Sequence, residues 1–200
     1  LHHESLSFYS VVGEIEKLYC HLSAILEITS PYQEQDFSQI SEKTLTIIPK
    51  ELKDKTSYAL HPSAMTSLAG LFKATRAMNQ NPIKILYGQN SYFECAEAAH
   101  FVSEAKSLEG ASSQDLIDAD IYLAQFSPVW KGLNSEAKHY SVEDVNSNLK
   151  AILDAPRNKP LLLALDCTFN YINSPYVEKV LQTYCSYIEK GQLAVAVYRS

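Results

Sequence analysis

The sequence has little positive charge and no cluster of it. Seventeen lysines and arginines stand against 23 aspartates and glutamates, which gives a formal net charge of −6 over 200 residues. A nucleic-acid-binding surface needs a basic patch, and no run of lysine or arginine would make one here. The same absence argues against docking on an anionic membrane surface. We therefore expect neither nucleic acid nor membrane among the partners.

Long apolar runs and low-complexity segments are missing too. No apolar stretch approaches the roughly 20 residues that a membrane-spanning helix needs. Six glycines and eight prolines are too few for a low-complexity chain. Hydrophobic residues make up 46% of the sequence, which is typical of a globular protein and predicts a folded domain.

Familiar metal and nucleotide motifs are also absent. The cysteines Cys20, Cys95, Cys167 and Cys185 show no C-x-x-C spacing, which excludes a zinc ribbon and a thioredoxin motif. They lie in apolar segments, as reduced buried thiols do, so we expect a cytoplasmic protein. No G-x-G-x-x-G, P-loop, H-E-x-x-H or G-x-S-x-G motif occurs, and histidines and aspartates do not cluster as metal ligands. We expect no metal site.

What is present is an alternation of strand-like and helix-like segments. Short apolar runs predict strands at residues 83–87, 121–126, 161–165 and 193–198. Helical periodicity and capping signals predict helices over residues 5–28, 64–78, 92–108, 141–154 and 174–190, with short helices and connections over 31–56. Such alternation implies βαβ units. We expect an α/β fold with three layers (αβα) and a mostly parallel sheet, preceded by an N-terminal helix.

The carboxyl ends of the strands are where open α/β sheets bind ligands. Polar and aromatic residues follow the four predicted strands, at residues 88–92, 127–130, 166–168 and 199–200. Asp166 directly follows the most apolar run, and it either serves a ligand or begins a turn by bonding its own backbone. Ser63 either caps a helix or also binds a phosphate at that helix N-terminus. Tyr92 is either a ligand-stacking ring or a packed aromatic.

Taken together, these stretches resemble the large domain of fold-type-I pyridoxal-phosphate (PLP) enzymes, most closely the cysteine/methionine-metabolism branch. Residues 63–67 (SAMTS) resemble the Ser-Gly-Met-Ala-Ala stretch at which a helix N-terminus holds the cofactor phosphate. Residues 89–92 (QNSY) resemble the loop whose tyrosine stacks on the pyridine ring. Residues 165–169 (LDCTF) resemble the Asp-Asn-Thr-Phe stretch whose aspartate pairs with the pyridine nitrogen, and residues 126–128 (FSP) resemble the family's Glu-Ser-Pro.

The resemblance implies a site and a domain arrangement. The cofactor-binding residues it implies are Ser63, Ala64, Met65, Tyr92, Asp166, Thr168 and Ser200. The family's Schiff-base lysine is expected just beyond Ser200, so no catalytic residue is assigned within the chain. We expect an N-terminal helical segment over residues 1–55 and an α/β cofactor-binding large domain over 56–200. That domain is expected to end before the lysine and the C-terminal small domain, and the family implies an amino-acid substrate and a homodimer.

Two departures from the family pattern keep other interpretations open. Trp130 stands where the family offers an asparagine to the ring oxygen, and Ala64 replaces a glycine near the phosphate, which restricts the backbone there. The first interpretation is a PLP-dependent enzyme, either a transsulfuration-like lyase or transferase or an aminotransferase. The second is a catalytically inactive relative that acts as a binding or assembly protein. The third is an unrelated α/β domain that binds a sugar or phosphate ligand at the same strand ends.

Overall fold

The computed structural model describes residues 46–57, 63–79, 82–88, 91–125, 142–168 and 174–198. The chain divides into two compact units, Leu1–Lys43 and Thr44–Ser200, and all described residues belong to the second. The helix predicted over residues 5–28 therefore lies outside the described residues. The predicted domain boundary after residue 55 stays a prediction.

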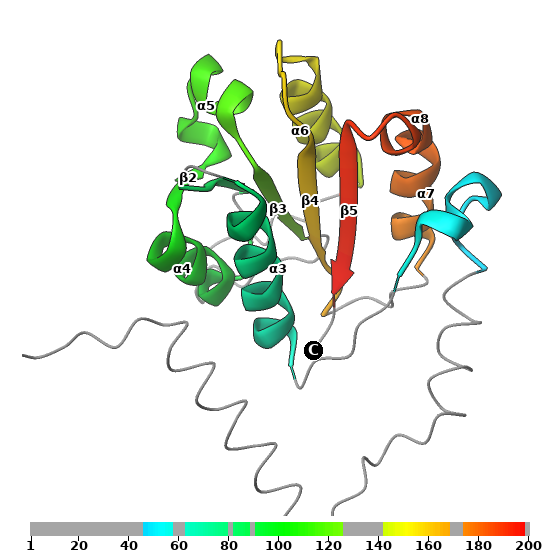
Figure 1. The fold of residues 1–200 in the computed structure, drawn as a ribbon, viewed down its shortest axis with the longest axis horizontal. Coiled ribbons are helices and arrows are strands. Elements are labelled where there is room, and N and C mark those ends of the chain that lie inside the picture. Colours follow the sequence, from blue (N-terminus) through cyan, green and yellow to red (C-terminus); the bar gives the residue numbers. More distant parts are fainter. Residues whose placement is uncertain are drawn as a thin grey trace, which may run out of the picture. The chain divides into compact units, whose positions relative to one another are not determined.

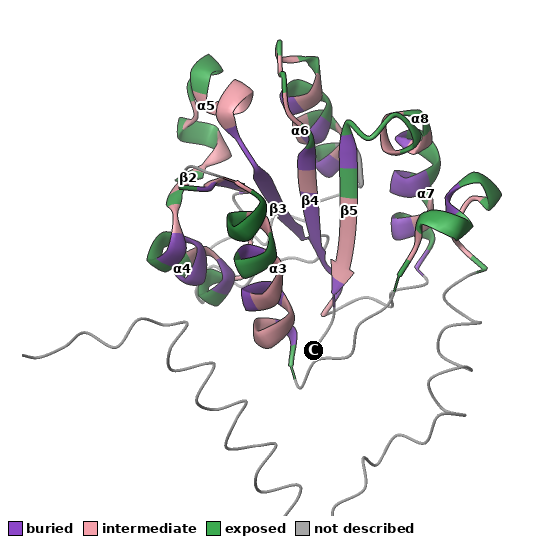
Figure 2. Cartoon of the chain, in the orientation of Figure 1, coloured by how far each residue is buried: buried purple, intermediate pink, exposed green. Residues whose placement is uncertain are grey.

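Five strands form one parallel sheet within the described residues (Figure 1). Their order across the sheet is β2-β1-β3-β4-β5. The strands are β1 (Lys84–Tyr87), β2 (Glu104–Ser107), β3 (Ile121–Gln125), β4 (Leu161–Asp166) and β5 (Leu193–Tyr198). The inner strands β3 and β4 are almost wholly buried (Figure 2), as expected for apolar strands covered on both faces.

Helices cover both faces of this sheet. Helices α3 and α4 lie on one face, and α6 and α7 lie on the other (Figure 1). The helices are α3 (Ala64–Met78), α4 (Phe93–Val102), α5 (Ser113–Asp118), α6 (Val142–Asp154), α7 (Pro175–Thr183) and α8 (Cys185–Glu189), with short 3-10 helices η1 (Lys50–Lys55) and η2 (Leu108–Gly110). The predicted α/β class, with three layers and a parallel sheet, is confirmed.

Two helices begin where capping serines predict. The Ser63 hydroxyl accepts the Thr66 N–H at 3.2 Å, and the Thr66 hydroxyl accepts the Ser63 N–H at 3.0 Å, which completes a capping box at the start of α3. At the start of α7 the Ser174 hydroxyl accepts the Val177 N–H at 3.4 Å, and Pro175 takes the first helical position. Each cap contributes about 1 kcal/mol, so these residues define the helix starts locally.

Two helix predictions are wrong in their extent. The helix predicted over residues 92–108 ends at Val102, and Glu104–Ser107 form the strand β2 instead. None of the β2 side chains is fully buried, because they alternate between exposed and half-buried positions. The resulting polar sequence is also typical of the exposed last turn of a helix. The helix predicted over residues 174–190 is interrupted at Tyr184, whose φ of −107° and ψ of 13° separate α7 from α8. With β2, the sheet has five strands where the sequence predicted four. The short helix α5 was not predicted either.

The largest core cluster lies between the sheet and helices α6 and α7. Tyr122, Leu149 and Leu163 are fully buried there. Burial of an aliphatic side chain of this size contributes roughly 1.5–3 kcal/mol. Alternate strand residues point to the opposite face, toward α3 and α4. On that face β3 and β4 present apolar side chains until the last residue of each strand, where Gln125 and Asp166 stand.

The order of the strands marks a ligand-binding position. The connection from β1 leads to β2 at one edge, whereas β3, β4 and β5 follow on the other side of β1. In open parallel sheets, ligands bind where this direction reverses, beyond the carboxyl ends of the strands. The ends of β3 and its neighbours, together with the start of α4, are therefore where a site is expected.

Candidate functional site

Three polar side chains end the neighbouring strands β3, β4 and β5. Gln125 pairs with Asp166, and Asp166 pairs with Tyr198, in the register of the sheet. Paired residues of adjacent strands point to the same face, so these three form one row, which we call the polar row. Their exposed fractions are only 3%, 5% and 6%. Polar groups buried this deeply need hydrogen-bond partners, so the contacts of each member decide what the row can do.

Asp166 is held by its own turn and by a thiol. Its Oδ1 accepts the Thr168 N–H at 2.8 Å, which is the turn-forming bond that the sequence also allows. Its Oδ2 accepts the S–H of Cys95 at 3.9 Å, and a thiol is a weak donor. The turn and the ligand role therefore do not exclude each other, because Oδ2 has capacity for a stronger donor.

Cys95 of α4 links Asp166 to Tyr198. Its Sγ lies 3.7 Å from the Tyr198 hydroxyl, and because the S–H points to the carboxylate, we infer that the tyrosine donates to the sulfur. Burial raises the pKa of the Cys95 thiol to about 12, against the opposing effect of the Tyr198 hydrogen bond. Burial also raises the pKa of Tyr198 well above its ordinary value. Both groups stay protonated near neutral pH, so Cys95 is a hydrogen-bond donor here and not a nucleophile.

Cys95 is expected to resist alkylation in the folded protein. With a pKa of about 12, only about one thiol in ten thousand is ionised at pH 8. Iodoacetamide at pH 8 should therefore modify the half-buried Cys185 well before Cys95, and peptide mass mapping measures both. Unfolding in urea should make the two cysteines equally reactive. Modification of Cys95 in the folded protein as fast as Cys185 would contradict this account of the thiol.

Gln125 has a buried amide that is unsatisfied in this structure. Neither its amide nitrogen nor its amide oxygen has a hydrogen-bond partner within the described residues. The side chain is only 3% exposed, and it lines the same pocket as the Asp166 carboxylate. An unpaired buried amide costs roughly 1–3 kcal/mol. The packing of the sheet does not account for a polar side chain at this position.

The first turn of α4 and the polar row line a closed pocket that has no room for a water molecule in this structure, so a ligand reaches the row only where these side chains move apart. The Gly88 N–H donates to the Leu123 carbonyl at 3.1 Å, and the Gly88 carbonyl accepts the Ser91 N–H at 2.9 Å. The Ser91 hydroxyl donates to the same Leu123 oxygen at 3.3 Å, which ties the turn to β3. Tyr92 follows at the N-terminus of α4, with its ring centroid 4.8 Å from that of Phe93. Tyr92 thus lines the same pocket as all three residues of the polar row.

The structure brings three of the predicted cofactor-binding residues together. Tyr92 and Asp166 line the same pocket, although they are 74 residues apart in sequence. Thr168 joins them through its backbone N–H, which holds the Asp166 carboxylate. This juxtaposition agrees with the arrangement that the resemblance implies, while the cofactor roles of these residues stay predictions.

The predicted phosphate-binding residues lie at the start of α3. Figure 1 shows this helix beginning on the side of the sheet toward which β5 runs. Ser63 is exposed and its hydroxyl is engaged in the capping box, whereas Ala64 is 7% exposed and Met65 is half-buried. Phosphate binding by these three stays a prediction. Ser200 and Trp130 lie outside the described residues, as does the predicted motif at residues 126–128.

Sequence reasoning missed Gln125, Tyr198 and Cys95. The first two are the last residues of their strands, and attention to the strand-end residues themselves, as well as to those that follow, would have found them. For Cys95 there is no such signal in the sequence. Its contact with Asp166 depends on how α4 packs over the sheet.

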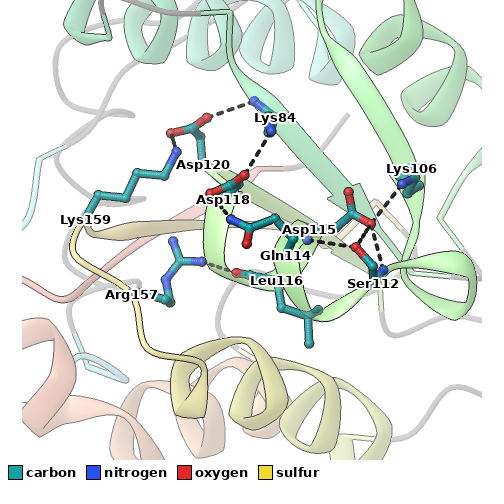
Figure 3. Close-up of polar contacts among 10 residues, drawn as sticks. All are labelled: Lys84, Lys106, Ser112, Gln114, Asp115, Leu116, Asp118, Asp120, Arg157 and Lys159. Carbon is teal, nitrogen blue, oxygen red and sulfur yellow. Dashed lines mark hydrogen bonds and ion pairs between the residues drawn. The ribbon is translucent and has the colours of Figure 1, made fainter.

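A second, larger pocket lies at the other end of the strands, where they begin. Figure 3 shows the charged side chains that gather there. Asp120 precedes β3 and accepts the Lys84 backbone N–H at 2.8 Å and the Lys159 Nζ at 2.6 Å. The Asn79 amide donates to the same carboxylate at 3.3 Å. The Lys84 Nζ pairs with Asp118 at 3.0 Å. These charges are paired with one another, which indicates that the cluster ties the starts of the strands together.

The same end of the sheet is tied to α5 by further polar contacts (Figure 3). Arg157 donates to the Leu116 carbonyl at 2.5 Å and to the Ala119 carbonyl at 2.6 Å, which joins the segment before β4 to the end of α5. At the start of α5, the ion pair with Lys106 lowers the pKa of Asp115. These contacts satisfy backbone and side-chain groups of the fold itself.

Within the described ranges, no group of three or more histidine, cysteine, aspartate or glutamate side chains is arranged to hold a metal ion. In the same part of the chain, no helix is both long and apolar enough to cross a bilayer.

Comparison with known proteins gives distant structural matches. No protein-family model matches the sequence, and the search of curated proteins finds no match. The aminotransferase AspB from Helicobacter pylori matches over 80% of this chain and 45% of its own length, with 19% identity and a TM-score of 0.44. A protein of Corynebacterium diphtheriae described as a putative PLP-dependent beta-cystathionase matches over 78% of this chain and 48% of its own, with 10% identity and a TM-score of 0.32. The chain thus spans less than half the length of either protein.

Proposed function

We propose that this chain is part of the cofactor-binding domain of a PLP-dependent enzyme that acts on an amino acid. The observation that carries the proposal is the setting of Asp166. It is a buried carboxylate at the carboxyl end of an inner strand, with one oxygen held by the backbone and the other bonded to a weak thiol donor. A protonated ring nitrogen is a stronger, charge-assisted donor for that second oxygen.

Three features of the described residues suit the ring and phosphate of PLP. The unpaired amide of Gln125 lies beside the carboxylate and needs a polar atom as its partner. Tyr92 lines the same pocket, and aromatic faces stack on planar rings. The N-terminus of α3 offers backbone N–H groups to a phosphate. The start of α3, Tyr92 and Asp166 occur along the sequence in the order that the family resemblance implies.

Each of these residues has a definable task in such a site. When bound, PLP supplies an electron sink for chemistry at the substrate, and the protein supplies orientation and charge. Asp166 would accept a hydrogen bond from the ring nitrogen and keep that nitrogen protonated. The Thr168 N–H would hold the carboxylate in its orientation. Cys95 and Tyr198 would close the sheet side of Asp166 against water.

The finer parts of the proposal concern the whole enzyme. The reaction would be a transsulfuration-like elimination or replacement, or else an amino transfer. The Schiff-base lysine would follow Ser200, and the protein would be a cytoplasmic homodimer. The alternatives are a catalytically inactive relative that acts as a binding or assembly protein, and an unrelated α/β domain that binds a sugar or phosphate ligand.

Equilibrium dialysis of PLP against the protein, in buffer free of phosphate and primary amines, tests the proposal. We expect saturable binding at one site per chain, with competition from inorganic phosphate and weaker competition from pyridoxal, which lacks the phosphate group. Full competition by phosphate with none by pyridoxal would favour the unrelated phosphate-binding domain. Uptake that rises without saturation, as random reaction with surface lysines would produce, would contradict the proposal. Turnover of amino acids by a PLP-saturated polypeptide that extends past Ser200 then separates an enzyme from an inactive relative.

A further inference from the structure

Gln125 is a buried residue whose side-chain amide is left wholly without a partner by the described fold, whereas Asn146 and Arg157 each have one such atom. Both of its polar atoms lack a partner within the described residues, and the side chain is 97% buried. Buried side-chain amides in folded proteins are normally hydrogen-bonded, because leaving one unpaired destabilises the folded state. An apolar side chain of similar length would pack here without that cost. The amide therefore points to a partner other than the described part of the chain.

The position of Gln125 shows where that partner would bind. Gln125 stands in register with Asp166 on the adjacent strand, and both side chains line the pocket under the first turn of α4. A carboxylate such as that of Asp166 accepts hydrogen bonds, whereas the amide of Gln125 both donates and accepts. The pair thus offers two acceptors and a donor side by side.

We propose that Gln125 is a ligand-binding residue that, together with Asp166, selects the ligand of this pocket. The ligand class that fits is a planar heteroaromatic ring with an N–H donor for Asp166 and a polar substituent within reach of the Gln125 amide. An apolar ring would leave both side chains unpaired, and a ring with the N–H alone would leave the amide unpaired. The identification of this ligand as PLP rests on the proposed function.

Replacement of the amide by an apolar side chain of similar length tests the inference in two independent ways. In the ligand-free protein, Gln125→Met should raise the Tm by about 2–4 °C, because an unpaired buried amide is removed. In the same variant, the dissociation constant for PLP should rise about tenfold, because a ligand hydrogen bond is lost. The matched control is Gln182→Met on α7, an exposed glutamine whose amide donates to Glu178. The control should change neither quantity appreciably.

The outcomes separate this inference from the proposed function. A Tm that falls in Gln125→Met would show that the amide already has a partner in the free protein, and this result overturns the inference. Unchanged PLP affinity in Gln125→Met, in a protein that does bind PLP, overturns it as well. Failure of the wild type to bind PLP contradicts the proposed function instead. The inference about Gln125 is then decided by the Tm, whose rise still shows an amide held without a partner in the ligand-free protein.

Discussion

Asp166→Asn is expected to weaken PLP binding by about 10- to 100-fold, as measured by equilibrium dialysis. The substitution removes the charge but keeps an oxygen at the same place. A neutral amide forms a weaker hydrogen bond with a protonated ring nitrogen than a carboxylate does, and it no longer favours the protonated state. The loss should therefore appear in affinity for PLP and much less in affinity for inorganic phosphate.

The fold should tolerate this change. The asparagine oxygen can still accept the Thr168 N–H, so the turn after β4 is kept. Asp154→Asn is the matched control, because it removes an equal charge from an exposed position on α6, where Asp154 pairs with Lys150. PLP affinity in Asp166→Asn equal to that of the wild type, with the protein folded by circular dichroism, would exclude contact between the ring nitrogen and Asp166.

Asp120→Ala is expected to lower the stability more than any other single substitution among the residues at the amino ends of the strands. Asp120 is 6% exposed and accepts hydrogen bonds from the Lys84 backbone, from Lys159 and from Asn79. Alanine would leave the first of these donors buried without its partner and the Lys159 charge unpaired. Breaking a buried charged cluster from one side costs about 3 kcal/mol, which lowers the Tm of a domain of this size by about 6–12 °C.

Two further variants show which contact is responsible. Asp120→Asn keeps an acceptor for the Lys84 N–H and should recover part of the loss. Lys159→Met should cost about 0–1 kcal/mol, because the Lys159 side chain is 34% exposed and partly solvated. Thermal unfolding followed by circular dichroism measures all three. A loss of 1 kcal/mol lowers the Tm of a domain of this size by at least about 2 °C. A Tm in Asp120→Ala within about 2 °C of the wild type would therefore contradict a structural role for this cluster.

The parts of the fold that the sequence predicts are those with a local cause. The start of α3 follows from Ser63 and that of α7 from Ser174 and Pro175, because each cap is made by neighbouring residues. Strand β4 is predicted because a wholly apolar run suits a strand covered on both faces. Strand β2 was missed because Glu104–Ser107 lie at the edge of the sheet, where pairing with β1 and not hydrophobicity defines the strand.

The candidate site also contains residues that the sequence predicts and residues that it does not. Asp166 was predicted because ligand-binding residues lie just beyond parallel strands, and Tyr92 was predicted mainly from the family resemblance. That Gln125 lies beside Asp166 depends on the register between β3 and β4, which is set by tertiary pairing. The contact of Cys95 with Asp166 depends on the position of α4 over the sheet. Neither contact has a local signature, so the polar row emerges only from the folded structure.

The location of bound PLP tests the central claim, that the polar row is the floor of a cofactor site, most directly. A crystal structure of the protein saturated with PLP would give this location. The account predicts that the ring nitrogen lies within hydrogen-bond distance of Asp166, with the Gln125 amide bonded to the ligand and the Tyr92 ring against it. PLP bound instead at the amino ends of the strands, beside Lys84 and Lys159, would contradict the account.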